Sequence, residues 1–462
     1  MPISALLVST YDLGHQPFGL ASPAAWLRRA GVEVRCADLS KEHLDERLLR
    51  DSQLVAFHLP MHTATRLAEP VIRHTREVNP SARICAFGLY APLNGEWLRS
   101  LGVDDVIGGE FEEELTAVAC GIAMGTAHPP RQGTRLPRLQ FLVPDRSELP
   151  PLVRYATLQR EDGSRRLAGY TEASRGCRHL CRHCPVVPVY AGQFRIVQPD
   201  IVLVDIAAQV EAGAEHITFG DPDFFNGPTH AMRIVHAMHV AHPSVTYDVT
   251  IKIEHLLKHL TLLPRLRETG CLFVTSAVES LDDRVLAILD KGHTRSDFVA
   301  AVEHCRAAGL TVVPTFVAFH PWTTLEGYCD LLDTIAALDL IDHIAPIQLA
   351  IRLLVPEGSR LLRTDEFVPF LGAFDPNTLA YRWLHPDPRV DLLHQEVAAI
   401  VGGRLATSRR AVFGEISALA HERAGLPHPR PTARAGERVS VPFMDEPWYC
   451  CAEPNPDQLR LV

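Results

Sequence analysis

Short apolar stretches alternate with longer amphipathic ones along most of this chain, and this alternation constrains its fold more than any other feature. In the N-terminal part the strand-like stretches are residues 4–9, 32–36, 53–58, 82–87 and 103–107, and the helix-like ones include 23–30 and 64–78. Strands that alternate with helices form parallel sheets covered on both faces. Five such units predict a flavodoxin-like, doubly wound domain over residues 1–127, whose ligand would lie beyond the carboxyl ends of the strands.

A second series of units follows a proline-rich segment, residues 128–165, which we interpret as an ordered linker between domains. We expect strands at 168–173, 216–220, 247–252, 272–278, 311–319 and 344–351, and helices at 200–212, 231–241, 256–269, 296–308 and 325–338. Six parallel units predict a partial (β/α)6 barrel over residues 166–360, with catalysis at the carboxyl ends of its strands. Residues 361–462 are less regular and are interpreted as a C-terminal extension.

Composition excludes several classes of protein. The net charge of −10, from 45 basic and 55 acidic residues, argues against a dedicated nucleic-acid surface. No apolar run approaches the roughly 18 residues that a membrane span needs, and the N-terminus resembles a first strand more than a signal peptide. Eleven cysteines form an odd number, so a disulfide framework is not expected and some thiols should bind metal or react. These features predict a cytoplasmic enzyme.

Three cysteines, Cys177, Cys181 and Cys184, follow the first expected barrel strand at C-x3-C-x2-C spacing. Cubane iron–sulfur clusters usually take four cysteine thiolates. Three clustered thiols with no fourth nearby would leave one iron open to a small-molecule ligand. This spacing therefore favours a [4Fe-4S] cluster that binds a second cofactor.

Two other interpretations of these cysteines stay open. A structural zinc site could be completed by His179 or His183, although such sites usually take their ligands from two separated pairs. The three positions also follow the i, i+4, i+7 pattern of one helix face. Gly176 and Pro185 flank a short, mostly charged segment, which disfavours that helix.

The cysteine motif resembles that of the radical S-adenosylmethionine (SAM) enzymes. In that family three cysteines hold a [4Fe-4S] cluster, SAM chelates the fourth iron, and reduction cleaves SAM to a 5′-deoxyadenosyl radical. Further segments resemble the family's SAM-contacting strand ends, namely residues 219–224, 276–280, 317–321 and 348–352. The resemblance assigns to SAM the residues His183, Gly220, Asp221, Asp223, Glu279, Ser280, Val317 and Arg352.

The chain departs from the family pattern at two points. His183 stands where an aromatic residue often precedes the third cysteine, and Gly220 to Asp223 read Gly-Asp-Pro-Asp where Gly-Gly-Glu is common. An acidic side chain there could still pair with the ammonium group of SAM. The alternative is that Asp221 and Asp223 cap the turn before the next helix.

A flavodoxin-like unit before the barrel resembles the cobalamin-binding subgroup of this family. Cobalamin domains with a histidine ligand carry Asp-x-His-x-x-Gly, whereas Asp12, His15 and Gly19 have a different spacing, so His15 is not assumed to ligate cobalt. The corrin could be bound through loop backbones. Candidate residues of this rim are Thr10, Tyr11, Asp12, His15, Pro60, His62, Gly88, Tyr90, Gly108, Gly109 and Glu110. Alternatively these are ordinary turn residues, and the domain is a structural relic or docks a partner.

The chain ends in Cys450-Cys451-Ala452-Glu453-Pro454, followed by eight further residues. This tail resembles that of the radical SAM proteins named for their Cys-Cys-Ala-Glu-Pro or selenocysteine-containing ends. Consecutive Cα atoms lie about 3.8 Å apart, below the roughly 4.4 Å of normal disulfides, so a bond between the two would be strained and easily reduced. We predict catalytic roles for Cys450 and Cys451, in substrate or metal binding, hydrogen donation or cluster ligation. Idle surface cysteines are the alternative.

Together these features predict an anaerobic radical SAM enzyme that uses a [4Fe-4S] cluster, SAM and cobalamin. The resemblance implies methylation of an unactivated carbon or phosphorus centre, with methylcobalamin supplying the carbon. The alternatives are a radical rearrangement or oxidation, with or without cobalamin, and a non-catalytic thiol-rich metal-binding protein. Expected partners are a small-molecule substrate, with a thiophilic molecule as one option, and an electron donor such as flavodoxin or ferredoxin. Neither nucleic acid nor a membrane is expected as a partner.

Overall fold

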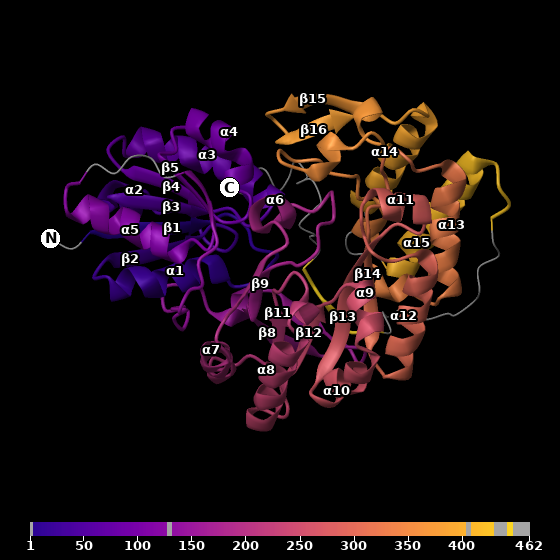
Figure 1. The fold of residues 1–462 in the computed structure, drawn as a ribbon, viewed down its shortest axis with the longest axis horizontal. Helices are drawn as coiled ribbons and strands as arrows, with labels where there is room; N and C mark the ends of the chain where they lie inside the picture. Colours follow the sequence, from indigo (N-terminus) through magenta and orange to yellow (C-terminus); the bar gives the residue numbers. More distant parts are fainter. Residues whose placement is uncertain (1–2, 127–131, 403–407, 429–440, 447–462) are drawn as a thin grey trace.

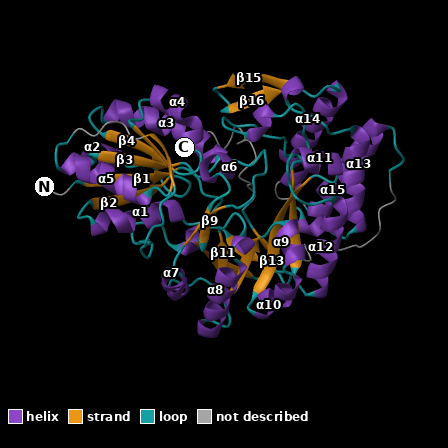
Figure 2. Ribbon diagram, viewed as in Figure 1, coloured by secondary structure: helices purple, strands orange, loops and turns teal. Residues whose placement is uncertain are grey.

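The computed structural model describes residues 3–126, 132–402, 408–428 and 441–446. Two α/β units follow one another, the N-terminal one in indigo and purple in Figure 1 and a larger one in magenta to orange. In the N-terminal unit helices flank the strands on both sides (Figure 2). The expected α/β class, a doubly wound layer followed by a partial barrel, is confirmed.

The N-terminal sheet has six parallel strands in the order β2-β1-β3-β4-β5-β6. The strands are β1 Ser4–Ser9, β2 Glu33–Asp38, β3 Leu54–His58, β4 Arg83–Phe87, β5 Asp105–Gly109 and β6 Gln132–Arg135. The helices are α1 Phe18–Arg29, α2 Glu46–Asp51, α3 His62–Val78, α4 Gly95–Ser100 and α5 Glu112–Ala123. Successive side chains of a strand point to opposite faces, so Leu6 joins the apolar core on one face and Leu7 the core on the other. This burial on both faces explains the near-continuous apolar strands.

Strand β6 comes from the segment interpreted as a linker. Its residues pair with β5 in parallel register, from Val106 opposite Gln132 to Gly109 opposite Arg135. The stretch has no apolar periodicity, and for this reason it was not predicted as a strand. An edge strand with a polar sequence can join a sheet through its backbone hydrogen bonds alone. The linker therefore begins within the N-terminal sheet.

The second sheet has the order β14-β13-β12-β11-β8-β7-β17 and supplies the partial barrel. Its five parallel strands are β8 Arg165–Thr171, β11 His216–Phe219, β12 Thr246–Thr250, β13 Cys271–Glu279 and β14 Thr311–Phe316. Two short antiparallel strands, β7 Thr157–Gln159 and β17 Phe443–Met444, extend one edge. The crossover helices are α7 Pro199–Glu211, α8 Pro228–Ala241, α9 Ile253–Lys258, α10 Leu263–Glu268, α11 Asp283–Ile288, α12 Arg295–Ala307 and α13 Leu325–Ala337. The carboxyl ends of the five parallel strands share one edge of the sheet, where the site is expected.

The prediction of a sixth barrel strand at residues 344–351 was wrong. This segment holds one 3-10 turn, Pro346–Leu349, and a single bridge between Phe319 and Arg352 is all that remains of the strand pairing. Pro346 opens this turn and has no N–H to donate to a ladder. The Gln348 side chain replaces the lost backbone pairing, since its Oε1 accepts a 2.9 Å hydrogen bond from the Phe316 N–H.

The prediction of a single helix at residues 256–269 was also wrong, because α9 and α10 are separate helices with a 3-10 turn between them. Pro264 lies in the first turn of α10, where its missing N–H costs nothing, whereas inside one continuous helix it would remove a backbone hydrogen bond. The break leaves α9 as a short helix directly after β12. It carries His255 close to the cysteine loop.

The C-terminal extension packs on the open side of the barrel. It contains the hairpin β15 Leu371–Asp375 and β16 Ala380–Trp383, and the helices α14 Pro388–Gly402 and α15 Arg409–Ala424. Buried residues of α14 and α15, such as Val397 and Ile416, share one apolar core with the barrel. Among the described residues, no helix is long and apolar enough to cross a membrane.

Candidate active site

The cysteine loop begins where β9 (Ser174–Gly176) ends and stops at α6 (Val186–Tyr190). Gly176 has a φ of 77°, and a Cβ there would lie 2.3 Å from the Tyr190 ring, so this turn requires glycine. The three cysteines lie in irregular backbone. The interpretation of their spacing as one face of a helix is therefore excluded.

The thiols lie in a partly apolar environment beside one cation. Burial raises the pKa of Cys177 to about 11 and that of Cys184 to about 12, so both thiols hold their protons at neutral pH unless a metal binds. A coordinating metal deprotonates such thiols outright. The Lys252 ammonium lies 3.7 Å from Sγ of Cys181 and offsets negative charge there. Thiol donors on one loop, beside a buried lysine, fit an iron–sulfur cluster.

The zinc alternative does not fit the positions of the two histidines. His183 Nε2 lies 3.1 Å from Glu279 Oε1, and His179 lies 3.5 Å from both Asp223 and Glu254. Within the described ranges, the group whose metal-donor atoms lie close together contains His179 and no cysteine. A closed Cys3His site is therefore absent from the described residues.

A buried charged centre faces the loop from the next strands. The β13 strand ends at Glu279, whose φ of 70° is a strained value for a residue with a side chain and is often associated with function. Its carboxylate lies 3.2 Å from the Lys291 ammonium and 3.1 Å from the His183 ring. Although burial alone would raise it, these two neighbours hold the pKa of Glu279 far below its usual range. This predicted SAM residue is therefore ionised and held in place.

The Gly-Asp-Pro-Asp segment follows β11 and is buried. Asp221 accepts a 2.9 Å hydrogen bond from the Ala173 N–H and another from the Ser174 hydroxyl, and its burial raises its pKa to about 7. Asp223 accepts a hydrogen bond from the Phe225 N–H and so caps the next 3-10 turn. The capping role considered for Asp223 is thus observed. Asp221 fastens the strand that leads into the cysteine loop.

A cavity of about 370 Å³ opens inside the barrel, within the range of about 300–1,000 Å³ typical of small-molecule sites. It is lined by polar residues such as Thr218 of β11, Asp248 of β12 and Gln348, together with Glu279 and Val317. A neighbouring cavity of about 260 Å³ is lined by Glu279, Ser280 and Val317. Three predicted SAM residues therefore surround two adjoining cavities.

A further cavity, of about 230 Å³, lies between the two domains. It is lined by the predicted cobalamin residues Asp12, Pro60, Gly88 and Gly109, and by His58. It lies at the carboxyl ends of the N-terminal strands and includes Gly176 from the edge of the cysteine loop. Its location and glycine-lined rim are those of a cobalamin site, but its volume in this structure is too small for a corrin ring.

Comparison with known protein families agrees with the interpretation of the cysteine loop as an iron–sulfur site. Residues 171–335 match the model of the Radical SAM superfamily. The chain contains a radical SAM domain.

Its curated relatives are distant. The chain is 23% identical to bacteriochlorophyllide d C-8(2)-methyltransferase of Chlorobaculum tepidum, over 51% of this chain and 52% of that one. It is 24% identical to tRNA-2-methylthio-N(6)-dimethylallyladenosine synthase of Pseudomonas syringae, over 55% of this chain and 57% of that one. The chain therefore spans about half the length of these relatives.

Solved structures share the fold of both domains. The radical enzyme OxsB with aqua-cobalamin bound gives a TM-score of 0.70 at 12% identity, covering 92% of this chain and 72% of that one. The methyltransferase TsrM from Kitasatospora setae, with tryptophan and a SAM analogue, gives 0.60 at 18% identity, covering 73% and 71%. These similarities extend the fold likeness beyond the radical SAM domain.

Several predicted cobalamin residues lie away from the interdomain cavity. His15 stacks on Tyr170 at 4.8 Å and lines the barrel cavity, where burial lowers its pKa to about 4. The Tyr11 hydroxyl donates to Glu446 Oε1 at 3.0 Å, and Glu446 also lines the barrel cavity. This loop of the N-terminal domain thus faces the radical SAM domain.

The other predicted residues of that rim stabilise the N-terminal domain. The Thr10 hydroxyl donates to the Ala64 carbonyl at 2.8 Å, and the rings of His62 and Tyr90 pack edge to face. Gly108 packs closely on Pro92, where a Cβ would lie 2.6 Å from that ring.

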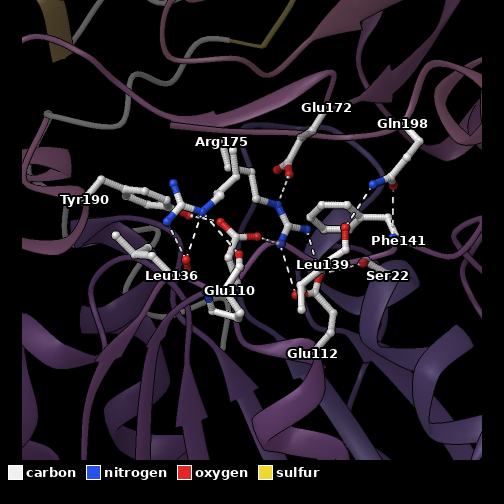
Figure 3. A network of polar contacts seen from close by, with 12 residues as sticks. Ser22, Glu110, Glu112, Leu136, Leu139, Phe141, Glu172, Arg175, Tyr190 and Gln198 are labelled. Atoms are coloured by element: carbon white, nitrogen blue, oxygen red, sulfur yellow. Dashed lines mark hydrogen bonds and ion pairs between the residues drawn. The ribbon is translucent and has the colours of Figure 1, made fainter. Parts of the chain in front are cut away.

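Glu110 belongs to a buried ion network that joins the domains (Figure 3). At its centre is Arg175, two residues before Cys177, whose guanidinium contacts Glu110, Glu112 and Glu172 at 3.2, 2.8 and 2.6 Å. The same guanidinium lies about 5 Å from the Phe111 and Phe141 rings. The radical SAM domain is therefore anchored to the other domain at the start of its cysteine loop.

The last sequence-predicted site residues are Arg352 and the two cysteines of the tail. The Arg352 guanidinium binds Asp391 Oδ1 at 2.6 Å and stacks on Trp383 at 3.7 Å, so it holds the C-terminal extension and lines none of the cavities described above. Cys450 and Cys451 lie outside the described residues.

Sequence reasoning missed the charged partners of the site. Lys252, Lys291 and Arg175 are not among the predicted site residues, although all three are nearly fully buried. Lys252 lies two residues after β12, and this strand-end position was a usable signal. Nothing local marks Lys291, because its partner Glu279 lies on another element.

Proposed function

We propose that this chain is a radical SAM enzyme that cleaves SAM reductively at the carboxyl edge of its barrel. The observation that carries this proposal is the irregular three-cysteine loop, in which Cys181 lies beside Lys252 and His183 contacts Glu279, the partner of Lys291. Glu279 also lines the small-molecule-sized barrel cavity. When bound, a [4Fe-4S] cluster and SAM supply one-electron cleavage of the sulfonium group. The chain's own task is then to hold both and to exclude water.

Each residue has a proposed part in this task. Cys177, Cys181 and Cys184 hold the cluster, and the Lys252 ammonium offsets the charge of the thiolates. Glu279, held by Lys291, would accept hydrogen bonds from the SAM ribose, and its contact with His183 would fix that ring as a stacking surface for the adenine. The remaining SAM contacts are proposed to come from Gly220 and Asp221, which follow β11, and from Ser280 and Val317, which line the cavity beside Glu279.

We further propose that cobalamin binds between the domains and that the enzyme methylates an unactivated carbon or phosphorus centre. The fold shared with OxsB and TsrM supports this, as does the cavity that joins the Gly88 and Gly109 rim to the cysteine loop. The runner-up is a radical rearrangement or oxidation, which the small size of that cavity favours. A non-catalytic thiol-rich metal protein is a third candidate, against which the two adjoining cavities argue.

The tail is proposed to act at the barrel cavity as a pair of catalytic thiols. Glu446 lines that cavity, and Cys450 and Cys451 follow it by four and five residues. A chain of that length spans at most about 13–18 Å, so both thiols can reach the cavity. Such thiols suit a thiophilic or small polar substrate.

The proposed setting is a reducing one. All nine cysteines among the described residues are free, as is usual in the cytoplasm. A flavodoxin or ferredoxin is the proposed electron donor, and neither nucleic acid nor membrane is a proposed partner.

The decisive experiment reconstitutes the chain anaerobically with iron, sulfide and hydroxocobalamin, and then reduces it with SAM. The wild type should form 5′-deoxyadenosine, whereas Cys181→Ala should form none. Cys329→Ala is the matched control, because Cys329 is buried in the core of α13 away from the loop. S-adenosylhomocysteine with stoichiometric cobalamin would support methyl transfer. 5′-Deoxyadenosine without cobalamin would exclude it, and no 5′-deoxyadenosine at all would overturn the enzyme proposal.

A further inference from the structure

Two loops and one short helix at the carboxyl edge of the barrel bring together two imidazoles and one carboxylate. His179 comes from the cysteine loop, Asp223 from the loop after β11, and His255 from α9 after β12. One donor atom of each lies within 4.8 Å of the other two. These residues are 76 positions apart in sequence at most, and only the curvature of the sheet brings them together.

The donor atoms are buried. The Asp223 side chain has no solvent exposure, and those of His255 and His179 are 7% and 16% exposed. Burying a carboxylate beside two imidazoles costs free energy unless its remaining lone pairs are used. The site therefore requires something to satisfy these atoms.

The three groups do not satisfy one another. His255 Nδ1 lies 2.7 Å from Asp223 Oδ2, and His179 Nε2 lies 3.5 Å from the same oxygen. Despite these distances, all three atoms lack a partner with hydrogen-bond geometry among the described residues. Close atoms that do not point at each other are the arrangement expected when they point at a common third atom.

The spacing suits a metal ion. With metal–ligand bonds of about 2.0–2.1 Å, neighbouring donor atoms in tetrahedral or octahedral sites lie about 3.0–3.4 Å apart. The two measured distances fall on either side of that value. The Glu254 carboxylate also lies 3.5 Å from the other nitrogen of His179, which is how second-shell carboxylates orient metal-binding histidines.

We propose that His179, Asp223 and His255 bind one divalent transition-metal ion, separate from the iron–sulfur cluster. Two histidines and one carboxylate are typical ligands of zinc and of non-haem iron(II), and they leave coordination positions for water or a small oxygen or sulfur ligand. The ion ties the cysteine loop to the loop after β11 and to helix α9. This role replaces the SAM contact expected for Asp223.

The test measures metal content, which is independent of radical SAM activity. The reconstituted full chain is treated with a chelator, equilibrated with Zn²⁺ and freed of excess, and zinc, iron and sulfide are counted per chain. Wild type should hold one zinc beyond its cluster. Asp223→Asn and His255→Ala should lose that zinc while keeping wild-type iron and sulfide. Asn is a good helix cap, so Asp223→Asn should retain the hydrogen bond to Phe225.

His259→Ala is the matched control, because His259 lies one residue after α9, four positions beyond His255, and belongs to no metal-donor group among the described residues. This variant should keep the zinc. The proposal is overturned if wild type binds no zinc beyond the cluster, or if Asp223→Asn and His255→Ala bind as much as wild type. It is equally overturned if zinc disappears on mutation of Cys181 and not of His255, since the ion would then lie on the cysteines.

Discussion

Nη2 of Arg175 lies 2.8 Å from Oε1 of Glu112, and this ion pair joins the two domains with both side chains almost wholly buried. Arg175 precedes the first cluster cysteine by two residues, and Glu112 begins helix α5 of the N-terminal domain. Glu110 and Glu172 bind the same guanidinium, as Figure 3 shows. A planar group with five donors can serve three carboxylates, which a lysine cannot do. The position of the cysteine loop therefore depends on a cluster of charges at the domain interface.

Arg175→Met should destabilise the protein strongly. It removes the cation and leaves three buried carboxylates uncompensated, and breaking a buried pair in this way costs about 3–5 kcal/mol. Urea unfolding would show the loss as a lower midpoint. Arg47→Met removes an exposed pair with Asp45 and should leave the urea midpoint nearly unchanged. Equal losses in the two variants would contradict a structural role for Arg175.

Glu110 should make stability depend on pH. Burial raises its pKa from 4.5 to about 7, although Arg175 opposes this shift. Between those two values the folded state keeps a proton that the unfolded state has released, so stability falls as pH rises through this window. Glu110→Gln cannot ionise and should remove up to about 3 kcal/mol of that fall.

The measurement is a series of unfolding curves between pH 4.5 and 8 for wild type and variant. The difference between them should grow in favour of Glu110→Gln as pH rises. Asp221 has a similarly raised pKa and adds the same trend to both proteins, so only their difference reports Glu110. A constant difference across the range would contradict the prediction.

Lys252→Met should make the reconstituted cluster harder to reduce. The ammonium lies 3.7 Å from Sγ of Cys181, and a nearby positive charge favours the more negative, reduced state. At a protein-like dielectric this interaction is worth about 1–3 kcal/mol, so the midpoint potential should fall by roughly 40–130 mV. A potentiometric titration followed by electron paramagnetic resonance measures it. Lys258→Met, at the exposed end of α9, the helix that begins directly after Lys252, should leave the potential unchanged.

Gly19→Ala should strain the wall of the interdomain cavity. A Cβ at this position would lie 2.1 Å from the His58 ring, which is buried and has a pKa lowered to about 3 by that burial. Overpacking of this kind costs about 1–3 kcal/mol. Gly414 is the matched control, because it is also helical but has nothing within 4 Å of its Cβ position. Thermal unfolding should show Gly19→Ala destabilised and Gly414→Ala stabilised by about 0.5–1 kcal/mol.

The sequence determined those features that depend on neighbouring residues. Apolar periodicity predicted β1 at its observed bounds and β3 and β4 to within one residue, because a buried strand requires its own side chains to be apolar. The spacing of Cys177, Cys181 and Cys184 predicted their common loop for the same local reason. Alternation of strands and helices predicted both domains.

Only the tertiary structure decided which distant groups meet. β6 has no apolar pattern and joins the N-terminal sheet through backbone hydrogen bonds, whereas the segment at 344–351 has the pattern of a strand but forms a 3-10 turn that begins at Pro346. The pairs Glu279–Lys291 and Arg175–Glu112, and the group of His179, Asp223 and His255, each join different elements. Their energies come from burial and charge at contacts that arise when the sheet curls and the domains dock, and no local pattern along the chain records those contacts.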